Sequence, residues 1–341
     1  MENGKSYMTT IGEYPLISLA DARTERDKKR LALLAGESPN KKPSQTFGDV
    51  ADEWKDKTMQ ALSLRYIQKT WRILSDYILP HVGHMPIKDI TAPDVLAALR
   101  RIEAQGKNAT AHTAHQICGQ VFRYAIACGY AIVNPADALK GALVPAVINH
   151  NASLTDPVKI QGLVRAMDAI DAGMVVKSAL WFSAYVFLRP GEVRHIEWRD
   201  VFLDDSEIRI PPEKMKLRRL HIVPLAPQVK ELLKTLQNIT GAGQYVFPSL
   251  RSRRGDTPMS ENTIAVCLRR MGYSSDEMTA HGFRSMASTR LNEMGFPADA
   301  IERQLAHVEG NHVRAAYNYA EYLPERRKMM CAWADWLDGL K

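Results

Sequence analysis

The chain has little cysteine and no long apolar segment, and both absences narrow what it can be. Its 341 residues include four cysteines, and no two of them have a CxxC or other metal-binding spacing. The longest nearly apolar run, Ala179 to Leu188, is far too short to cross a bilayer, and the N-terminus lacks the apolar core of a signal peptide. We therefore expect reduced thiols, no disulfide framework and a cytoplasmic protein without a membrane partner.

The sequence also lacks the common motifs that bind nucleotides or metal ions. The sequence contains no GxxxxGKS/T phosphate-binding loop and no HExxH motif. A two-metal nuclease needs clustered carboxylates, and the nearest approach, Asp204, Asp205 and Glu197, has no partners at a suitable spacing. We expect no metal ion and no other cofactor, and a reaction that is independent of ATP.

The composition is that of a folded protein with two or three domains. Hydrophobic residues make up 45% of the chain, which is too apolar for a disordered protein. The net charge is +7 and the isoelectric point is about 9.1. This excess suits a polyanionic partner but is also common in unrelated proteins, so charge alone does not identify the partner.

The first 45 residues have too little core to form a domain unaided. We expect a strand from Tyr7 to Ile11, a turn from Gly12 to Pro15 and a charged helix from Ser18 to Leu34. Ser18 and Asp21 have the spacing of a capping box at the start of this helix. The following residues, GESPNKKPSQ, have the composition of a linker.

Residues 46–142 have a helical pattern throughout. A third helix of this segment opens at Thr91, with Pro93 and Asp94 in its first turn, and a fourth runs from about Ala109 to Cys128. The first two helices are indicated by apolar stripes made of Phe47, Val50, Ala51 and Trp54, and of Tyr66, Trp71, Leu74 and Ile78. We predict a bundle of four helices, followed by a linker over residues 143–152.

Residues 153–341 are predicted to form a mostly helical α+β domain. Asp156 followed by Pro157 marks the start of its first helix. Ser206 to Ile210 and Leu220 to Val223 alternate as two antiparallel strands joined by a basic turn. Helices then resume at Pro227, Ser260, Arg284, Ala298, His312 and Pro324. The expected fold class is mainly α, with one small antiparallel sheet in the second domain.

The most informative stretch contains the motifs HGFR, ERQLAH and AAYNYA. It places His281, Arg284, His307 and Tyr317 within a few helical turns, and Arg189 lies upstream in LRPGEVRHIEW. Each of these residues alone is ordinary, because such side chains usually serve as solvated charges or packed core residues. Together they could surround one phosphate with cationic donors, imidazoles and a phenol able to attack.

These motifs, in this order, resemble those of the tyrosine recombinases, and more narrowly the phage-type integrases of satellite prophages and pathogenicity islands. The resemblance covers nearly the whole chain. It implies a partial arm-binding domain and linker at residues 1–45, with only the final strand and helix of that domain present. It further implies a core-binding domain that clamps DNA at 46–142, the linker at 143–152 and a catalytic domain at 153–341.

The resemblance also implies an activity and its partners. The protein would be a site-specific DNA recombinase that integrates or excises a mobile element through a 3′-phosphotyrosyl intermediate on Tyr317. Its partners would be double-stranded DNA attachment sites, three further copies of itself in a tetramer on DNA, and accessory DNA-bending or excision factors. It would work in the cytoplasm, at the nucleoid.

The candidate catalytic residues divide the chemistry of phosphoryl transfer among them. Arg189 and Arg284 would hold the non-bridging oxygens through paired hydrogen bonds that lysine cannot copy. Tyr317 would attack, while His281 helps to remove its proton and His307 donates to the phosphate. The structural alternative for the two arginines is a pair of ordinary ion pairs, in which Arg189 would bond Glu192 or Glu197.

The leaving oxygen needs a proton, and the basic hairpin supplies the candidate donors. The family places its catalytic lysine eight residues before a proline matched by Pro224, which implies Lys216, with Lys214 as the alternative. Glu192 is expected to support Arg189 or His281. Tyr319 and Tyr322 compete with Tyr317 as nucleophiles, and only the family's spacing from QLAH selects Tyr317.

Basic residues of both domains are candidates for DNA contacts, and the alternative is an ordinary solvated surface. Residues 46–142 contain 11 Lys and Arg against 9 Asp and Glu, so the charge balance does not decide between the two. By the resemblance, the DNA-contact candidates are Lys55, Lys57, Arg65, Lys69, Arg72, Arg100, Arg101, Arg123, Lys214, Arg218 and Arg219.

Two other functions stay open at this point. A type IB topoisomerase-like enzyme would share the chemistry but would form no Holliday junction, and a non-catalytic DNA-binding regulator could derive from a recombinase. The C-terminal helix likewise has two possible roles, because its apolar face could cover its own core or pack on a neighbouring protomer. That face comprises Tyr322, Met329, Met330, Trp333, Trp336 and Leu337.

Overall fold

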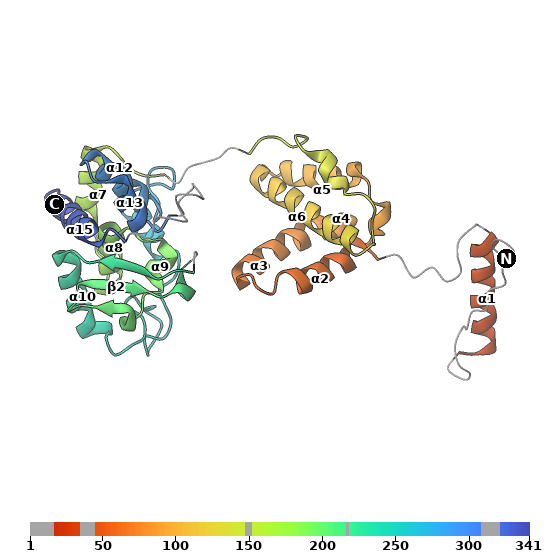
Figure 1. Cartoon of the computed structure of the whole chain (residues 1–341), viewed down its shortest axis with the longest axis horizontal. Coiled ribbons are helices and arrows are strands. Elements are labelled where there is room, and N and C mark those ends of the chain that lie inside the picture. Colours follow the sequence, from red (N-terminus) through yellow and green to blue (C-terminus); the bar gives the residue numbers. More distant parts are fainter. Residues whose placement is uncertain (1–16, 35–44, 147–151, 216–217, 308–320) are drawn as a thin grey trace. The chain divides into compact units, whose positions relative to one another are not determined.

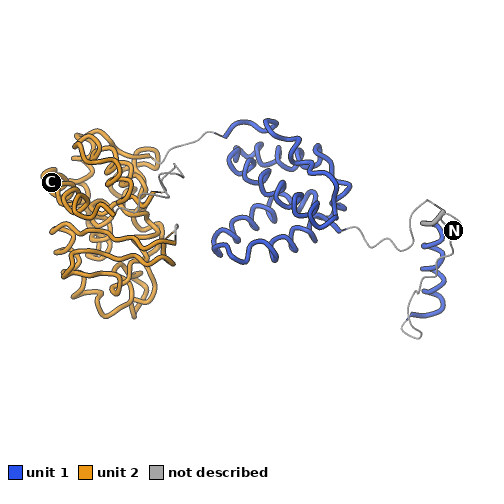
Figure 2. The backbone as a smooth tube through the Cα atoms, in the orientation of Figure 1, with its two compact units in different colours: residues 1–148 blue, residues 149–341 orange. Residues whose placement is uncertain are grey.

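The computed structural model describes residues 17–34, 45–146, 152–215, 218–307 and 321–341 (Figure 1). The chain divides into two compact units, Met1–Ile148 and Asn149–Lys341 (Figure 2). The division falls inside the segment predicted as a linker. Leu143 is buried in the core of the first unit, whereas the carbonyl of Ala152 accepts a hydrogen bond from the amide of Thr279 in the second.

The N-terminal helix α1 (Leu19–Leu34) begins where its capping residues predict. The hydroxyl of Ser18 accepts a 3.2 Å hydrogen bond from the amide of Asp21 and donates a 2.7 Å bond to its carboxylate. No α1 side chain that the structure describes is buried. The predicted strand and turn over residues 7–15 lie outside the described residues.

The predicted four-helix bundle is confirmed in the rest of the first unit. Its second helix continues without a break from α3 through a π-helical turn, η1, into α4, and short 3-10 segments η2 and η3 precede α5 and follow α6. Their bounds are α2 (Phe47–Thr58), α3 (Leu64–Ile73), η1 (Leu74–Ile78), α4 (Leu79–Val82), η2 (Ile87–Asp89), α5 (Ala92–Glu103), α6 (Asn108–Ala127) and η3 (Pro135–Leu139).

Capping residues set the starts of two of these helices. The hydroxyl of Thr46 accepts from the amide of Asp49 at 3.1 Å, and the Asp49 carboxylate accepts from the amide of Thr46, also at 3.1 Å. At α5, the carboxylate of Asp94 accepts from the amide of Thr91 at 2.9 Å. Each cap satisfies backbone donors that a helix start otherwise leaves without partners.

The core of the bundle includes the whole predicted stripe of α2, whose four residues are all buried. The ring of Phe47 lies 5.3 Å from that of Phe122 on α6. The assignment of Tyr66 to the core is wrong, because Tyr66 is 46% exposed. The buried residues of α3 are instead Thr70 and Ile73, and the partly buried side chains of Ile67 and Trp71 pack against the same core. A helical period allows this face equally well.

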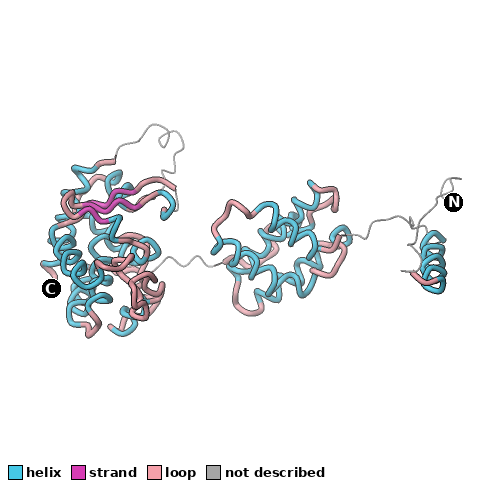
Figure 3. The backbone as a smooth tube through the Cα atoms, turned by 90° about the horizontal axis from the view of Figure 1, so that it is seen from below, coloured by secondary structure: helices cyan, strands magenta, loops and turns pink. Residues whose placement is uncertain are grey.

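Within the described residues, the second unit contains eight helices. A small sheet lies among them (Figure 3). The helices are α7 (Pro157–Ala169), α8 (Met174–Val186), α9 (Pro190–Arg194), α10 (Pro227–Thr240), α11 (Thr263–Arg270), α12 (Gly282–Glu293), α13 (Ala298–Gln304) and α15 (Leu323–Asp338). Short 3-10 segments are η4 (Trp198–Asp200) and η5 (Pro212–Lys214). The helix predicted near His312 lies outside the described residues.

The sheet is antiparallel, with the order β1-β2-β3. Strands β2 (Glu207–Ile210) and β3 (His221–Pro224) are the two predicted strands, with Ile208 opposite Val223. Strand β1 (Val201–Phe202) was not predicted, because two residues are too few for an alternating pattern. The mainly α fold with one small antiparallel sheet is therefore confirmed.

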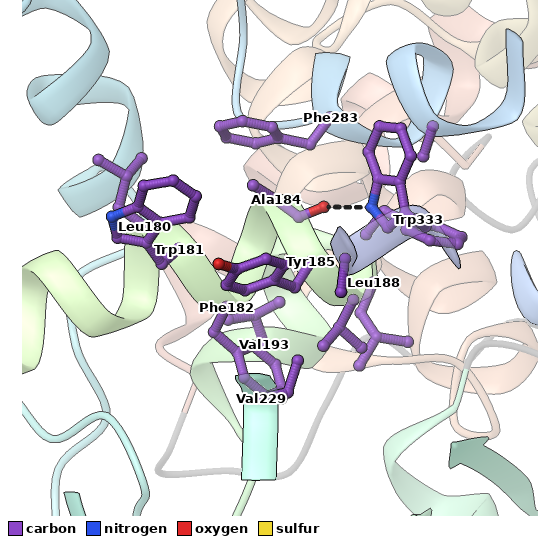
Figure 4. Packing of buried hydrophobic residues seen from close by; sticks show 14 of the residues in the cluster. Leu180, Trp181, Phe182, Ala184, Tyr185, Leu188, Val193, Val229, Phe283 and Trp333 are labelled. Carbon is purple, nitrogen blue, oxygen red and sulfur yellow. Dashed lines mark hydrogen bonds between the residues drawn. The ribbon is translucent and has the colours of Figure 1, made fainter. Parts of the chain in front are cut away.

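Helix α8 is the centre of this unit, and it contains most of the apolar run noted in the sequence. Every residue from Ser178 to Leu188 is buried, and Figure 4 shows Leu180, Phe182 and Leu188 among them. The indole of Trp333 on α15 donates a 2.9 Å hydrogen bond to the carbonyl of Ala184. Helix α15 thus packs its apolar face on the core of its own unit, where Trp333 and Leu337 are fully buried. No helix within the described residues is long and apolar enough to cross a membrane.

Candidate active site

Arg189 reaches the site from the turn that joins α8 to α9, and Glu192 holds it there. The backbone amide of Arg189 donates to one carboxylate oxygen of Glu192 at 2.9 Å, and Nη1 of the side chain donates to the other at 2.7 Å. Glu192 is only 8% exposed. The Arg189–Glu192 contact, three residues apart, was one of those expected from the sequence. Nη2 of Arg189 then donates to the carbonyl of Ala306, 3.0 Å away.

Arg284 lies in the first turn of α12 and is 3% exposed. Nη1 donates to the carbonyl of Phe187 at 2.9 Å, and Nη2 donates to the carbonyl of Leu305 at 2.6 Å. These hydrogen bonds go to neutral carbonyls rather than to a carboxylate. Burial, followed by the neighbouring charge of Arg189, lowers the pKa of Arg284 to about 10, so the guanidinium stays protonated at neutral pH.

Two residues with left-handed backbones support these arginines. Phe187 (φ 43°) ends α8 and Ala306 (φ 49°) follows α13, and neither is glycine. Such conformations cost on the order of 1 kcal/mol or more each. Their carbonyls accept from Arg284 and Arg189 respectively. Backbone strain therefore coincides with the point where the two guanidiniums are oriented.

The two predicted histidines differ in their surroundings. His281, the residue before α12, is half-buried, and its pKa is lowered by burial and then by the charges of Arg284 and Arg189. It is therefore neutral at pH 7 and able to accept a proton. His307 is exposed, and its Nε2 lies 3.2 Å from Nη2 of Arg284. Because arginine only donates, we assign the His307 proton to Nδ1, which lies 2.7 Å from the Glu302 carboxylate. Nε2 is then an acceptor, so donation from His307 to the phosphate, which needs a proton on Nε2, stays a prediction.

Glycine is required just after His281. A Cβ on Gly282 would lie 2.4 Å from the carbonyl of Ala152 and 2.9 Å from the sulfur of Met278. The amide of Gly282 donates to the Thr279 hydroxyl at 3.0 Å. The G of the HGFR motif thus lets the start of α12 approach the beginning of the second unit closely.

The predicted proton donor Lys216 and nucleophile Tyr317 lie outside the described residues, as does Tyr319. Tyr322, the other competing nucleophile, is described, and its hydroxyl donates to the carboxylate of Asp299 at 3.4 Å. It is the residue before α15 and has a left-handed backbone. Its hydroxyl is therefore directed at a carboxylate of α13.

Lys214 was predicted to contact DNA or to serve as the alternative proton donor, but its ammonium is held by two carboxylates. Its ammonium lies 2.7 Å from Glu197 and 2.6 Å from Asp200, and its side chain is only 15% exposed. The short segment η5 places Lys214 beside η4, where the two carboxylates lie. We therefore correct the expectation for Lys214 to a structural ion pair. Arg218 and Arg219 are exposed on the same hairpin.

The basic residues of the first unit divide in a similar way. Arg65, Lys69 and Arg72 are exposed at positions 0, 4 and 7 of α3, so they form one stripe. Lys55 instead lies 3.8 Å above the ring of Trp71 and pairs with Asp52 at 3.0 Å.

The other basic candidates of the first unit are exposed, namely Lys57, Arg100, Arg101 and Arg123. Arg123 also lines a hollow of about 400 Å³ with Trp54, Thr58, Met59, Leu62, Tyr66 and Gln120.

Several contacts that hold the candidate residues could not be predicted from the sequence. The carbonyls of Phe187, Leu305 and Ala306 carry no side-chain signal, and Glu302 has no motif that links it to His307. Within the described residues, no group of three or more His, Cys, Asp or Glu side chains could hold a metal ion.

Comparison with known proteins identifies the family. Residues 47–142 match the phage integrase central domain, and residues 155–323 match the phage integrase family. The integrase of Shigella phage Sf6 is 36% identical over 346 residues, which cover 98% of this chain and 88% of that protein. The chain belongs to the phage integrase family. This integrase is therefore a tyrosine-type site-specific DNA recombinase, as its motifs indicated.

Other relatives agree with this assignment, and solved structures share the fold. The prophage integrase IntS of Escherichia coli K12 is also 36% identical, over 98% of this chain and 88% of its own. The integrase of Enterobacteria phage P4 is 34% identical, over 96% and 79%. The fold is similar to that of a lambda integrase tetramer bound to a Holliday junction, with a TM-score of 0.63 and 20% identity over 93% of this chain and 90% of that one. A Tn1549 transposon integrase in complex with circular intermediate DNA has a TM-score of 0.61 and 14% identity, over 84% of this chain and 99% of that one.

Proposed function

We propose that this integrase cleaves and rejoins attachment-site DNA through a 3′-phosphotyrosyl intermediate on Tyr317, with Arg189 and Arg284 holding the scissile phosphate. The observation that carries this proposal is the convergence of the two guanidiniums. Arg189 and Arg284 are far apart in sequence, yet they donate to the adjacent carbonyls of Ala306 and Leu305. Two cations this close, one of them deeply buried, suit an anionic ligand.

The guanidiniums keep donors for such a ligand. A guanidinium has five N–H groups. Within the described residues, Arg284 uses three of them, toward Phe187, Leu305 and His307. Arg189 uses two, toward Glu192 and Ala306. The remaining N–H groups can bond the non-bridging oxygens, whose charge increases as the phosphorus becomes pentavalent.

The proton transfers follow from the chemistry of the remaining groups. The Tyr317 phenol attacks the phosphorus, and its proton passes to the neutral imidazole of His281. The bond from phosphorus to the 5′ oxygen breaks, and Lys216 gives that oxygen a proton. The product is a 3′-phosphotyrosine with a free 5′ hydroxyl. The 5′ hydroxyl of the exchanged strand then reverses these steps, so the phosphodiester is restored without ATP.

Assembly and location are part of the same proposal. Strand exchange between two duplexes needs four active sites, so we propose a homotetramer on paired attachment sites. The exposed stripe of Arg65, Lys69 and Arg72 would contact the phosphate backbone, and Lys57, Arg123, Arg218 and Arg219 would add to it. Accessory DNA-bending or excision factors would bring the sites together. This work would take place at the nucleoid, in the cytoplasm.

The experiment is a recombination assay on DNA that flanks the protein's own gene. The integrase is incubated with a supercoiled plasmid carrying this DNA, and the products are sequenced and examined for Holliday junctions. We expect new junctions at a fixed position, with Holliday-junction intermediates. Relaxation of supercoils without new junctions would indicate the topoisomerase-like alternative, and binding without strand cleavage would indicate the regulator.

A further inference from the structure

Arg326, in the first turn of α15, is completely buried, with 0% of its surface exposed. Nε and Nη2 both donate to the side-chain oxygen of Gln304, at 3.0 and 2.7 Å. Nη2 also donates to the carbonyl of Ile222 on β3, and Nη1 donates to the carbonyl of Glu321 at 3.2 Å. One buried guanidinium thus joins β3, the end of α13 and the start of α15.

This charge is held mainly by neutral acceptors. The carboxylate of Glu321 lies 3.7 Å from Nη1 of Arg326, and Glu321 is shared with Arg303, whose Nε lies 3.1 Å from the same carboxylate. Burial and the nearby charge of Arg303 lower the pKa of Arg326 to about 9, so it is still charged at neutral pH. An apolar side chain fills a core position at lower cost than a buried ion does. Stability alone is therefore a poor explanation for arginine here.

The neighbours of Arg326 lead directly to the proposed phosphate site. Gln304 is the last residue of α13, and the next two residues are Leu305 and Ala306. The carbonyl of Leu305 accepts from Arg284, and that of Ala306 accepts from Arg189. The bond from Arg326 to Gln304 therefore fixes the end of the segment that orients both guanidiniums.

We propose that Arg326 is a positioning residue, which holds Gln304 so that the carbonyls of Leu305 and Ala306 aim Arg284 and Arg189 at the scissile phosphate. This inference rests on the proposed function, because it assumes that the two arginines bind that phosphate. Arg326 itself touches neither guanidinium through any hydrogen bond in the described residues, so its effect is indirect.

The test compares two scissile linkages in the full-length protein. One suicide substrate carries an ordinary phosphodiester, and the other carries a methylphosphonate, whose neutral linkage has one fewer charged oxygen for the guanidiniums to stabilise. Strand release is measured at saturating protein. The variants are Arg326→Met, which removes the donors but fills the space, and Arg326→Lys, which keeps the charge without the planar group of donors.

We expect Arg326→Met to cleave the ordinary linkage about 10- to 100-fold more slowly, because small misplacements of catalytic groups have effects of this size. On the methylphosphonate, the difference in cleavage rate between Arg326→Met and the wild type should be at least severalfold smaller. Arg326→Lys should show the same pattern with a smaller loss of rate on the ordinary linkage. Leu337→Ala is the control, because it opens a cavity on the same helix without touching Gln304. Any decrease in the cleavage rate of Leu337→Ala should be equal on both linkages.

Two outcomes would overturn the inference. In the first, Arg326→Met cleaves both linkages at the wild-type rate. In the second, its cleavage rate falls by the same factor on both linkages, as expected for the control. If Arg326→Met does not fold, as judged by its melting temperature, Arg326→Lys alone decides by the same comparison. Arg284→Ala identifies a failure of the underlying proposal. If that variant shows no recovery on the methylphosphonate, then the phosphate assignment itself is wrong, whatever Arg326 does.

Discussion

The guanidinium of Arg284 donates a 2.9 Å hydrogen bond to the carbonyl of Phe187, the residue that ends α8 in a left-handed conformation. Were α8 to continue, this carbonyl would point along the helix axis toward the next turn. The left-handed turn instead directs it at a residue 97 positions further along the chain. Arg284 is therefore oriented by the backbone before any DNA binds, which reduces the reorganisation needed during the reaction.

Arg284→Lys should reduce cleavage strongly while leaving DNA binding within a few fold. An ammonium cannot reach the carbonyls of Phe187 and Leu305 and also bond two phosphate oxygens, so we expect a loss of about 100-fold or more in the rate of cleavage. Single-turnover cleavage of a core site measures the rate. Arg290→Lys on the same helix is the matched control and should cleave at nearly the wild-type rate. An Arg284→Lys variant as fast as that control would show that no bidentate contact is made.

Lys216→Ala should slow cleavage of an ordinary phosphodiester far more than cleavage of a substrate with sulfur at the 5′ bridging position. A thiolate leaves without needing a proton, so the acid becomes dispensable on the sulfur substrate. Lys214→Ala is the control, and it should not show this selective recovery, because Lys214 is paired with Glu197 and Asp200. Equal losses of Lys216→Ala on both substrates would exclude it as the proton donor.

The cleavage rate should depend on pH through His281. Its pKa lies below the ordinary value of about 6.5 because of burial and the charges of Arg284 and Arg189. A base must be neutral, so the rate should rise with pH through this lowered pKa and then stay level near neutrality. The midpoint of the acid limb should therefore lie below pH 6.5, and His281→Gln should remove that limb. A midpoint above this value, or a limb unchanged in the variant, would contradict the role.

The stability of the second unit should depend on pH through His221 on β3. It is 4% exposed, and burial followed by the charges of Arg326 and Arg303 lowers its pKa to about 3. The unfolded chain binds a proton near pH 6.5 and the folded chain does not, so stability is lost as pH falls below 6.5. The sensitivity is about 1.4 kcal/mol per pH unit between those values.

His221→Leu removes this titration, so unfolding of the second unit in urea at pH 7 and pH 5 measures the effect. The wild type should lose about 2 kcal/mol more than the variant between pH 7 and pH 5. Ile222→Val on the same strand is a control that removes no titrating group, and it should keep the wild-type slope. An identical slope in wild type and His221→Leu would show that His221 is not held neutral in the folded protein.

The parts of the fold that could be predicted from the sequence are those set by neighbouring residues. The cap of Ser18 by Asp21, the start of α7 at Pro157 and the support of Arg189 by Glu192 all depend on residues at most three apart. Tyr66 was wrongly assigned to the core because an amphipathic period fits more than one choice of buried stripe. Strand β1 was missed because pairing with β2, rather than its own two residues, defines it.

The sequence allows the candidate side chains of the site to be proposed, but not the contacts that hold them. Arg284 could be nominated from HGFR, but its bonds to Phe187 and Leu305 join residues 97 and 21 positions apart through backbone atoms. Such contacts have no sequence pattern. The ion pairs of Lys214 likewise depend on how η5 folds against η4, so the sequence showed only a basic turn.

The covalent adduct at Tyr317 is the most direct test of the whole account. A nicked suicide substrate releases the short strand after cleavage, so the integrase stays linked to DNA and migrates as a larger species. The wild type, Tyr319→Phe and Tyr322→Phe should all become linked, whereas Tyr317→Phe should bind the same DNA and form no adduct, because only the attacking oxygen is removed. An adduct formed by Tyr317→Phe and absent from Tyr319→Phe or Tyr322→Phe would contradict the central claim.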